Sequence, residues 1–147
     1  ATYLADDPAY ARKAEQVALK VRDVAEVVAD EMVSLADWEG INGNRDVVFH
    51  PPCSLQHGQQ VRGMVESILS TVGYRLHQFP DAHLCCGSAG TYSLLQSEMA
   101  DALRKNKLAA LQSTDASCIV TANIGCQVHL ASEAEVPVCH WIELLDR

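Results

Sequence analysis

The sequence lacks several features that mark common classes of protein. It has only 11 Lys and Arg residues against 19 Asp and Glu, which gives a formal net charge of −8 at pH 7. This balance argues against nucleic acid or an anionic membrane as a partner. No apolar run approaches the roughly 20 residues that cross a bilayer, and we recognise no signal peptide. We therefore expect a cytoplasmic protein without a direct membrane span and, since Ala1 is not Met, a processed chain or an excised piece.

Motifs of several enzyme classes are also missing. The chain has no Gly-x-Gly-x-x-Gly fingerprint and no Walker loop, so it is not predicted to bind a nucleotide through either. It has no thioredoxin-like Cys-x-x-Cys, and the position six residues after each candidate nucleophilic cysteine holds no Arg, as a phosphatase loop would need. Those positions hold Gln59, Thr91, Tyr92 and Ser132. A Cys–His hydrolase stays open, but that chemistry needs only one cysteine.

The pattern that is present alternates strands with helices. Short apolar runs at 47–49, 74–79, 117–122 and 136–138 predict strands, and helical spacing of apolar residues predicts helices over 61–69 and 91–111. Before them, valines from Val17 onward recur at helical spacing and predict one long amphipathic helix from about Pro8 to Ala36. Such alternation implies right-handed crossovers. We expect an α/β fold with a small open parallel sheet of about four strands, flanking helices and a long N-terminal helix.

Five of the six cysteines follow predicted strand ends. Cys53 follows the first strand, Cys85 and Cys86 the second, Cys126 the third and Cys139 the fourth. Because the carboxyl ends of parallel strands share one edge of the sheet, these side chains are expected to meet there. Cysteines clustered in a cytosolic chain more often serve metal or redox chemistry than structural disulfides.

Local sequence refines this prediction. The glycines of 87–90 let backbone N–H groups approach a bound centre at a helix start, and the positive end of that helix favours thiolate. The adjacent pair Cys85-Cys86 suits a cluster of several irons better than one tetrahedral zinc, although two buried thiols or a vicinal disulfide remain alternatives. Cys118 lies within an apolar strand and is expected to be a structural thiol. His50 and His57 flank Cys53 and are expected to orient or cap rather than ligate.

Three segments together resemble a known family: 50–57 (HPPCSLQH), 84–92 (LCCGSAGTY) and 122–126 (ANIGC). They are similar to the cysteine-rich (CCG) domain shared by several redox subunits. Among these are the heterodisulfide reductase B subunit, the anaerobic glycerol-3-phosphate dehydrogenase C subunit, lactate-utilisation proteins and glycolate oxidase (glycolate dehydrogenase) iron–sulfur subunits. The likeness to the last is greatest and covers about residues 46–147. The resemblance implies a division into 1–45, the helix and linker that end a preceding domain, and 46–147, the cysteine-rich domain.

The resemblance also implies a metal centre. The family pattern ends in Cys-x-x-Cys, whereas this chain has Asn123 at the first of those two positions. The expected ligands are therefore Cys53, Cys85, Cys86 and Cys126, with Cys139, His50 and His57 in reserve. Four thiolates suffice for a [4Fe–4S] cluster or for zinc. We expect an iron–sulfur cluster of the [4Fe–4S] type, with zinc as the alternative and an empty site in an isolated, air-exposed fragment.

The implied function is that of a non-catalytic redox subunit. Flavin-containing dehydrogenase subunits would oxidise glycolate or another 2-hydroxy acid, and this subunit would relay electrons towards a membrane acceptor from the inner face of the membrane. The rest of its own chain, a ferredoxin-like part and a first cysteine-rich domain, is a further expected partner. Two alternatives stay open: a structural-zinc or metal-free docking domain for subunit assembly, and a thiol–disulfide enzyme that uses Cys85 and Cys86.

Overall fold

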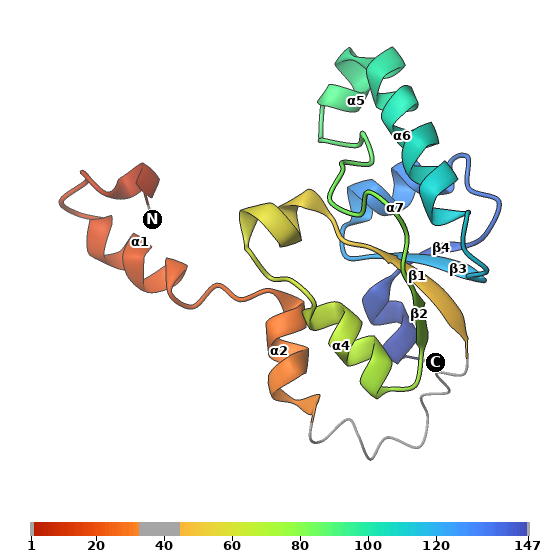
Figure 1. Ribbon diagram of the computed structural model, residues 1–147. Helices are drawn as coiled ribbons and strands as arrows, with labels where there is room; N and C mark the ends of the chain where they lie inside the picture. Colours follow the sequence, from red (N-terminus) through yellow and green to blue (C-terminus); the bar gives the residue numbers. More distant parts are fainter. Residues whose placement is uncertain (1, 33–44, 147) are drawn as a thin grey trace.

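The computed structural model describes residues 2–32 and 45–146. Its centre is a four-stranded sheet in the order β2-β1-β3-β4, in which every neighbouring pair is parallel. The strands are β1 (Asp46–His50), β2 (Arg75–His77), β3 (Cys118–Thr121) and β4 (Val138–His140). Helices lie on both faces of the sheet (Figure 1). The predicted α/β fold with a small, open parallel sheet is confirmed.

Successive residues of β1 point to opposite faces of the sheet, as strand geometry requires. Val47 and Phe49 pack into one core with α2 (Val24–Asp30), α4 (Met64–Thr71) and the 3-10 helix η3 (Trp141–Leu145). Val48 packs into the other core with α6 (Ser97–Leu111) and α7 (Ile124–Ala131). Both faces of the sheet are covered, and the side chains of Val47, Val48 and Phe49 are at most 4% exposed. In Figure 1, α4 lies below the sheet while α6 and α7 lie above it.

The prediction of one long N-terminal helix over Pro8–Ala36 is wrong, because the chain forms two short helices in the described part of that segment. These are α1 (Ala11–Ala18) and α2, separated by a break. Asp23 causes the break: it takes an extended conformation and starts α2 in a capping box with Glu26, whose carboxylate accepts from the Asp23 N–H at 2.7 Å. The Asp-x-x-Glu signal was present in the sequence. The predicted end of the helix lies outside the described residues.

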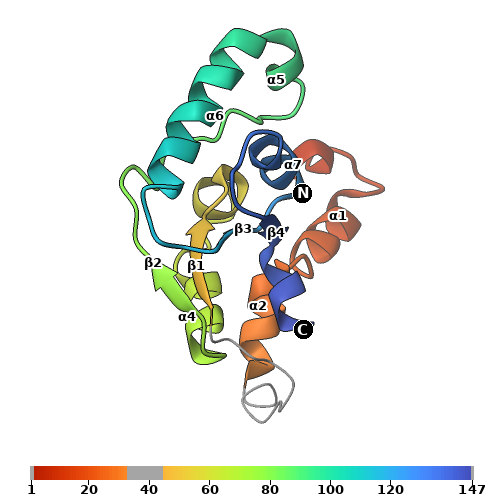
Figure 2. The ribbon, with the colours of Figure 1, turned by 90° about the vertical axis from the view of Figure 1, so that its right-hand side faces the viewer.

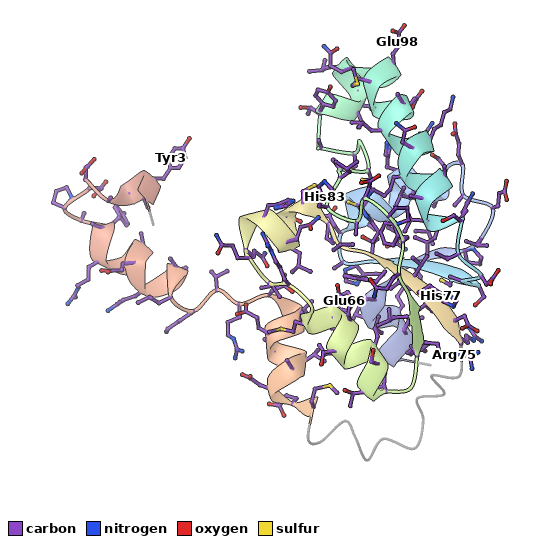
Figure 3. The ribbon with its side chains drawn as sticks, in the orientation of Figure 1. Tyr3, Glu66, Arg75, His77, His83 and Glu98 are labelled. Atoms are coloured by element: carbon purple, nitrogen blue, oxygen red, sulfur yellow. The ribbon has the colours of Figure 1, made fainter. Side chains whose placement is uncertain are left out.

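The two N-terminal helices have different surroundings. Ala25 of α2 is fully buried in the core beneath β1, so α2 belongs to the packed body. By contrast, α1 has no buried residue, and Val17 is 63% exposed. Figure 1 shows α1 standing apart from the sheet, and Figure 3 shows Tyr3 extending from the same segment. The predicted domain division at residues 45 and 46 stays a prediction.

The helix predicted over 91–111 is interrupted at Gln96, where the backbone leaves the helical region with φ −130° and ψ 53°. One turn, α5 (Tyr92–Leu95), precedes α6. The apolar spacing that predicts this helix includes Leu94, Leu95 and Met99, yet these side chains are 81%, 77% and 55% exposed. The reason is visible in Figures 1 and 2: α5 and the start of α6 extend beyond the sheet, so no strand lies beneath them.

The fourth strand begins two residues later than predicted, at Val138. Pro137 has no N–H that could donate a hydrogen bond to a neighbouring strand, although its C=O accepts one from the Ile119 N–H at 2.9 Å. As a result, Cys139 lies inside β4 and not beyond its end. No helix of the described residues is long and apolar enough to cross a membrane.

Candidate metal centre

The first wall of the candidate site is built where β1 ends. His50 is the last residue of β1 and is completely buried. Thr121 at the end of β3 holds it in place, because its Oγ1 donates to the His50 C=O at 3.0 Å. Cys53 follows two prolines and leads into η2 (Ser54–Gly58), a single π-helical turn. Such turns often occur at functional sites.

The second wall is the loop after β2, which carries Cys85 and Cys86. Cys86 is 1% exposed and packs in the core beneath α6 and α7, while Cys85 is half-buried. Gly87 follows with φ +95°, and its N–H donates to the Cys85 Sγ at 3.3 Å. A Cβ at this position would collide with the backbone oxygen of Ala100. Only glycine combines this backbone conformation with such close packing, so Gly87 fixes where the two thiols lie.

The third wall follows β3. Asn123 takes an extended conformation and caps α7, and its Oδ1 accepts from the N–H groups of Gly125 at 2.9 Å and Cys126 at 3.3 Å. Its Nδ2 donates to the Ser54 Oγ at 3.4 Å, which ties this loop to the π-helical turn. Asn123 therefore orders this loop as the side-chain cap of α7. Cys126 sits in the first turn of α7 and is 9% exposed.

These three loops enclose one pocket of about 510 Å³. Cys53, Cys85, Cys86 and Cys126 all line it. The expectation that sequence-distant cysteines meet at the carboxyl edge of the sheet thus agrees with the geometry for these four. Sequence reasoning did not single out the two hydroxyls that share the pocket, Ser54 and Ser88. Ser54 directly follows Cys53 and Ser88 lies two residues after Cys86, and this closeness in sequence was the available signal.

Cys86 and Cys126 share a hydrogen bond between their thiols. Donor atoms of His50, Cys86 and Cys126 all lie within 4.8 Å of one another. The Cys126 thiol donates a hydrogen bond that holds the pKa of Cys86 at about 4, well below its ordinary value, and His50 adds to this effect against the cost of burial. The same hydrogen bond and burial raise the pKa of Cys126. The two shifts run in opposite directions, so Cys86 is the thiol of this pair that more readily becomes a thiolate, the form that binds a metal cation.

A third thiol and a buried lysine complete the electrostatics. Burial, and next the neighbouring Cys85, raise the pKa of Cys53. Lys107 of α6 is 3% exposed and donates from Nζ to the Asp81 C=O at 2.6 Å. Burial lowers its pKa, while the charges of Cys86 and other nearby thiolates oppose that shift. The amino group of Lys107 does not line the pocket, but it is close enough for its charge to interact with the thiols there.

The reserve residues fall into two groups. Cys139 faces the opposite side of the sheet, in the core with α4, and its Sγ lies 3.4 Å from the Sγ of Cys118. It is therefore not part of the pocket. His57 is exposed, and its Nε2 lies 3.5 Å from the His83 C=O, so it too lies outside the group that surrounds Cys86. Only His50 of the three belongs to that group.

Comparison with known proteins agrees with this geometry. Residues 47–131, more than half of the chain, match the family described as CCG, the cysteine-rich domain. This chain belongs to that family. The matched segment begins in β1 and ends with α7, so it contains the whole pocket.

Relatives of the cysteine-rich domain family show which proteins contain similar segments. The chain is 46% identical, over 98% of its length, to the glycolate oxidase iron–sulfur subunit of Escherichia coli (strain K12), and spans 35% of that protein. It is 30% identical, over 99% of its length, to a fumarate reductase (CoM/CoB) subunit of Methanothermobacter marburgensis, and spans 30% of it. It is 25% identical to lactate utilization protein A of Bacillus subtilis (strain 168), over 96% of the chain and 61% of that relative. The chain thus spans about a third of the first two.

Proposed function

We propose that this chain is the cysteine-rich part of an iron–sulfur electron-transfer subunit, in which Cys53, Cys85, Cys86 and Cys126 hold the cluster. The observation that carries the proposal is that these four cysteines, from three loops, line one pocket. Similarity to iron–sulfur subunits of glycolate oxidase supports it. Four thiolates satisfy a [4Fe–4S] cluster, which is the type we propose.

The chemistry of the donor set fits such a group. Thiolates are the ligands of iron–sulfur clusters, and the lowered pKa of Cys86 favours its thiolate form. When bound, the cluster supplies one-electron transfer. The residues of the chain then have three tasks: Gly87 and Asn123 fix the loops that carry the thiols, burial of Cys86 and Cys126 excludes water, and Lys107 places an amino group nearby.

Within a larger complex, we propose that flavin-containing subunits oxidise glycolate or a related 2-hydroxy acid and that this subunit passes the electrons towards a membrane acceptor on the cytoplasmic side. The names of the relatives as subunits of glycolate oxidase and of a fumarate reductase support partners of this kind. No residue of this chain is assigned contact with the 2-hydroxy acid.

The test is anaerobic purification and reconstitution of the chain, followed by iron and sulfide analysis and by ultraviolet–visible and electron paramagnetic resonance spectra. We expect near-stoichiometric iron and sulfide, lost in Cys86→Ser. Cys118→Ser is the matched control, because Cys118 lies on the other face of the sheet and its loss should leave the cluster intact. Failure of the wild-type chain to take up iron would contradict the proposal.

A second candidate is a structural-zinc or metal-free domain for subunit assembly. Apolar side chains exposed beside the pocket favour it: Leu84 precedes Cys85, Ile124 follows Asn123, and Leu94 lies on α5 just after the Ser88–Gly90 loop. Their exposed fractions are 46%, 68% and 81%. Such surfaces commonly mark protein contacts. Stoichiometric zinc without colour, or no metal at all together with intact assembly, would favour this candidate.

A further inference from the structure

His50 has an imidazole ring that acts on the nearby Cys86 thiol and lowers its pKa, but within the described part of the chain no protein atom meets either ring nitrogen in hydrogen-bond geometry. The residue is 0% exposed, yet neither Nδ1 nor Nε2 has a hydrogen-bond partner there. Buried polar atoms are almost always satisfied, and one that is not calls for an explanation, such as an ion that binds it. The unused ring nitrogens of His50 therefore point to a partner outside the protein's own hydrogen bonds.

The direction of the ring follows from the sheet. Along β1, Val48 faces the core that contains Cys86 and Cys126, and His50 is two residues further on the same face. The geometry agrees, since donor atoms of His50, Cys86 and Cys126 all lie within 4.8 Å of one another. The hydrogen bond from Thr121 to the His50 C=O fixes the backbone at this point. The ring is thus held against two of the cysteines already assigned to the cluster.

Asn123 is not available as a further ligand. Its Oδ1 already accepts two backbone hydrogen bonds, from Gly125 and Cys126, and its Nδ2 donates to Ser54. An amide oxygen has two lone pairs, and both are occupied by the cap. A further ligand on this side of the pocket must therefore come from another residue. Arg104 Nε and Trp141 Nε1 are also buried without a hydrogen-bond partner among the described residues, but of these side chains only the His50 imidazole can bind a metal.

We propose that His50 is a nitrogen ligand of the centre, in addition to Cys53, Cys85, Cys86 and Cys126. Because four thiolates already supply one ligand to each iron of a [4Fe–4S] cluster, this fifth ligand requires one iron to take two protein ligands. The inference rests on the proposed function, because it assumes that these cysteines hold an iron–sulfur cluster. A neutral imidazole adds a ligand without adding negative charge. Replacement of thiolate by histidine raises the reduction potential of a cluster, so a Cys/His set would be more easily reduced than the same centre with a fifth thiolate.

The test uses the full chain, reconstituted without oxygen after growth with ¹⁵N-labelled histidine, and pulsed electron paramagnetic resonance of the paramagnetic state. We expect a nitrogen coupling of the size produced by a directly bonded imidazole. It should vanish in His50→Gln and persist in His57→Gln, the matched control on the exposed π-helical turn. Circular dichroism and the urea midpoint show whether each variant is folded.

A second variant keeps the test decisive if His50→Gln does not fold. His50→Cys offers a thiolate in the same place, so it should retain iron and sulfide, lose the nitrogen coupling and shift the midpoint potential downward. A cluster with full iron and sulfide but only the weak coupling of a hydrogen-bonded ring, or a coupling unchanged in both variants, would overturn the ligand role and leave the proposed function standing. A wild-type chain that takes up no iron would overturn both.

Discussion

Asn123 caps the helix that carries Cys126, with its Oδ1 3.3 Å from the Cys126 nitrogen. Through its Nδ2 the same side chain reaches Ser54 in the turn that follows Cys53. One amide therefore orders two of the three loops that surround the pocket. Asparagine at this position cannot serve as a thiolate ligand, but its hydrogen bonds fix the loops that carry Cys53 and Cys126.

The cap makes a direct prediction for stability. Asn123→Ala removes the acceptor for two N–H groups, and we expect the free energy of unfolding to fall by about 1 kcal/mol. Urea unfolding measures the change. Asn106→Ala is the matched control, because Asn106 is exposed in the middle of α6, where alanine is the better helix former. Equal losses in the two variants would show that Asn123 does not act as a cap.

Gly87 provides a second prediction, which separates the cost of a positive φ from the cost of a steric clash with the Ala100 oxygen. Gly87→Ala places a methyl group against the Ala100 oxygen at φ +95°, whereas Gly90→Ala at φ +58° meets nothing within 4 Å. Both should destabilise the fold through strain, by at least about 1 kcal/mol. We expect a clearly larger loss at Gly87, together with reduced iron uptake. Similar losses in thermal unfolding would contradict the close approach to α6.

Cys118 and Cys139 form a pair on the opposite face of the sheet, with 3.4 Å between the sulfurs. We expect Cys118→Ala and Cys139→Ala to keep the full iron and sulfide content of the wild type. Each should instead lose stability, on the order of 1 kcal/mol, because a packed side chain is shortened. Iron analysis and urea unfolding test both parts. Loss of iron in either variant, with the fold intact, would mean that a ligand lies on the face of the sheet opposite the pocket, and it would contradict this prediction.

Asp46 predicts a dependence of stability on pH. Arg75 donates from Nε to its Oδ1 at 2.9 Å and His77 lies 3.0 Å from the same oxygen (both are labelled in Figure 3). These hydrogen bonds, Arg75 first, hold the pKa of Asp46 well below its usual 3.8. Because the pKa of this carboxyl is lower in the folded than in the unfolded state, its ionised form stabilises the fold at pH values above the unfolded-state pKa. This contribution is lost as the pH falls through the folded-state pKa.

The urea midpoint of the wild type should therefore decrease as the pH is lowered from about 5 to about 2, and Asp46→Asn should make this decrease smaller. Because these side chains are partly exposed, the effect should weaken with added salt. Asp115→Asn, which changes an exposed carboxylate in the loop before β3, serves as the control. A pH profile that is the same for all three proteins would contradict the role of Asp46.

Lys107 gives a prediction for the reduction potential of the proposed cluster. A cation beside the thiolates favours the more negative, reduced state, so Lys107→Met should lower the midpoint potential. Lys105→Met is the matched control, since Lys105 is exposed on the same helix. Redox titration followed by visible absorption measures both. A potential that does not change in Lys107→Met would mean that the amino group is uncharged or acts too weakly at the pocket.

Much of this architecture follows from local sequence. The strands could be predicted because short runs such as 47–49 are apolar throughout, which is typical of strands buried on both faces. The gathering of Cys53, Cys86 and Cys126 then followed from a general property of parallel sheets. The Asx cap at Asn123 was also readable, because an asparagine one residue before a helix has few other roles.

The misplaced features depend on tertiary contacts. Cys139 was expected at the pocket, but the register of β4 against β3 decides that it lies within the strand and on the opposite face. Leu94 and Leu95 have helical spacing, yet a periodic pattern cannot reveal that no sheet lies beneath them. The sequence placed His50 in reserve together with His57, and it could not separate the two, because burial and hydrogen-bond partners are known only after every neighbour has been placed.

The strand order also sets the sequence of events during synthesis. β1 is made first but lies between β2 and β3, so the loop with Cys53 cannot meet the loop with Cys126 until β3 has docked. Contacts between parallel strands are distant in sequence and slow to form. The thiols at 53, 85 and 86 are therefore synthesised before the loop that completes the pocket. If these residues hold the proposed cluster, its full set of ligands is assembled only after β3 has docked.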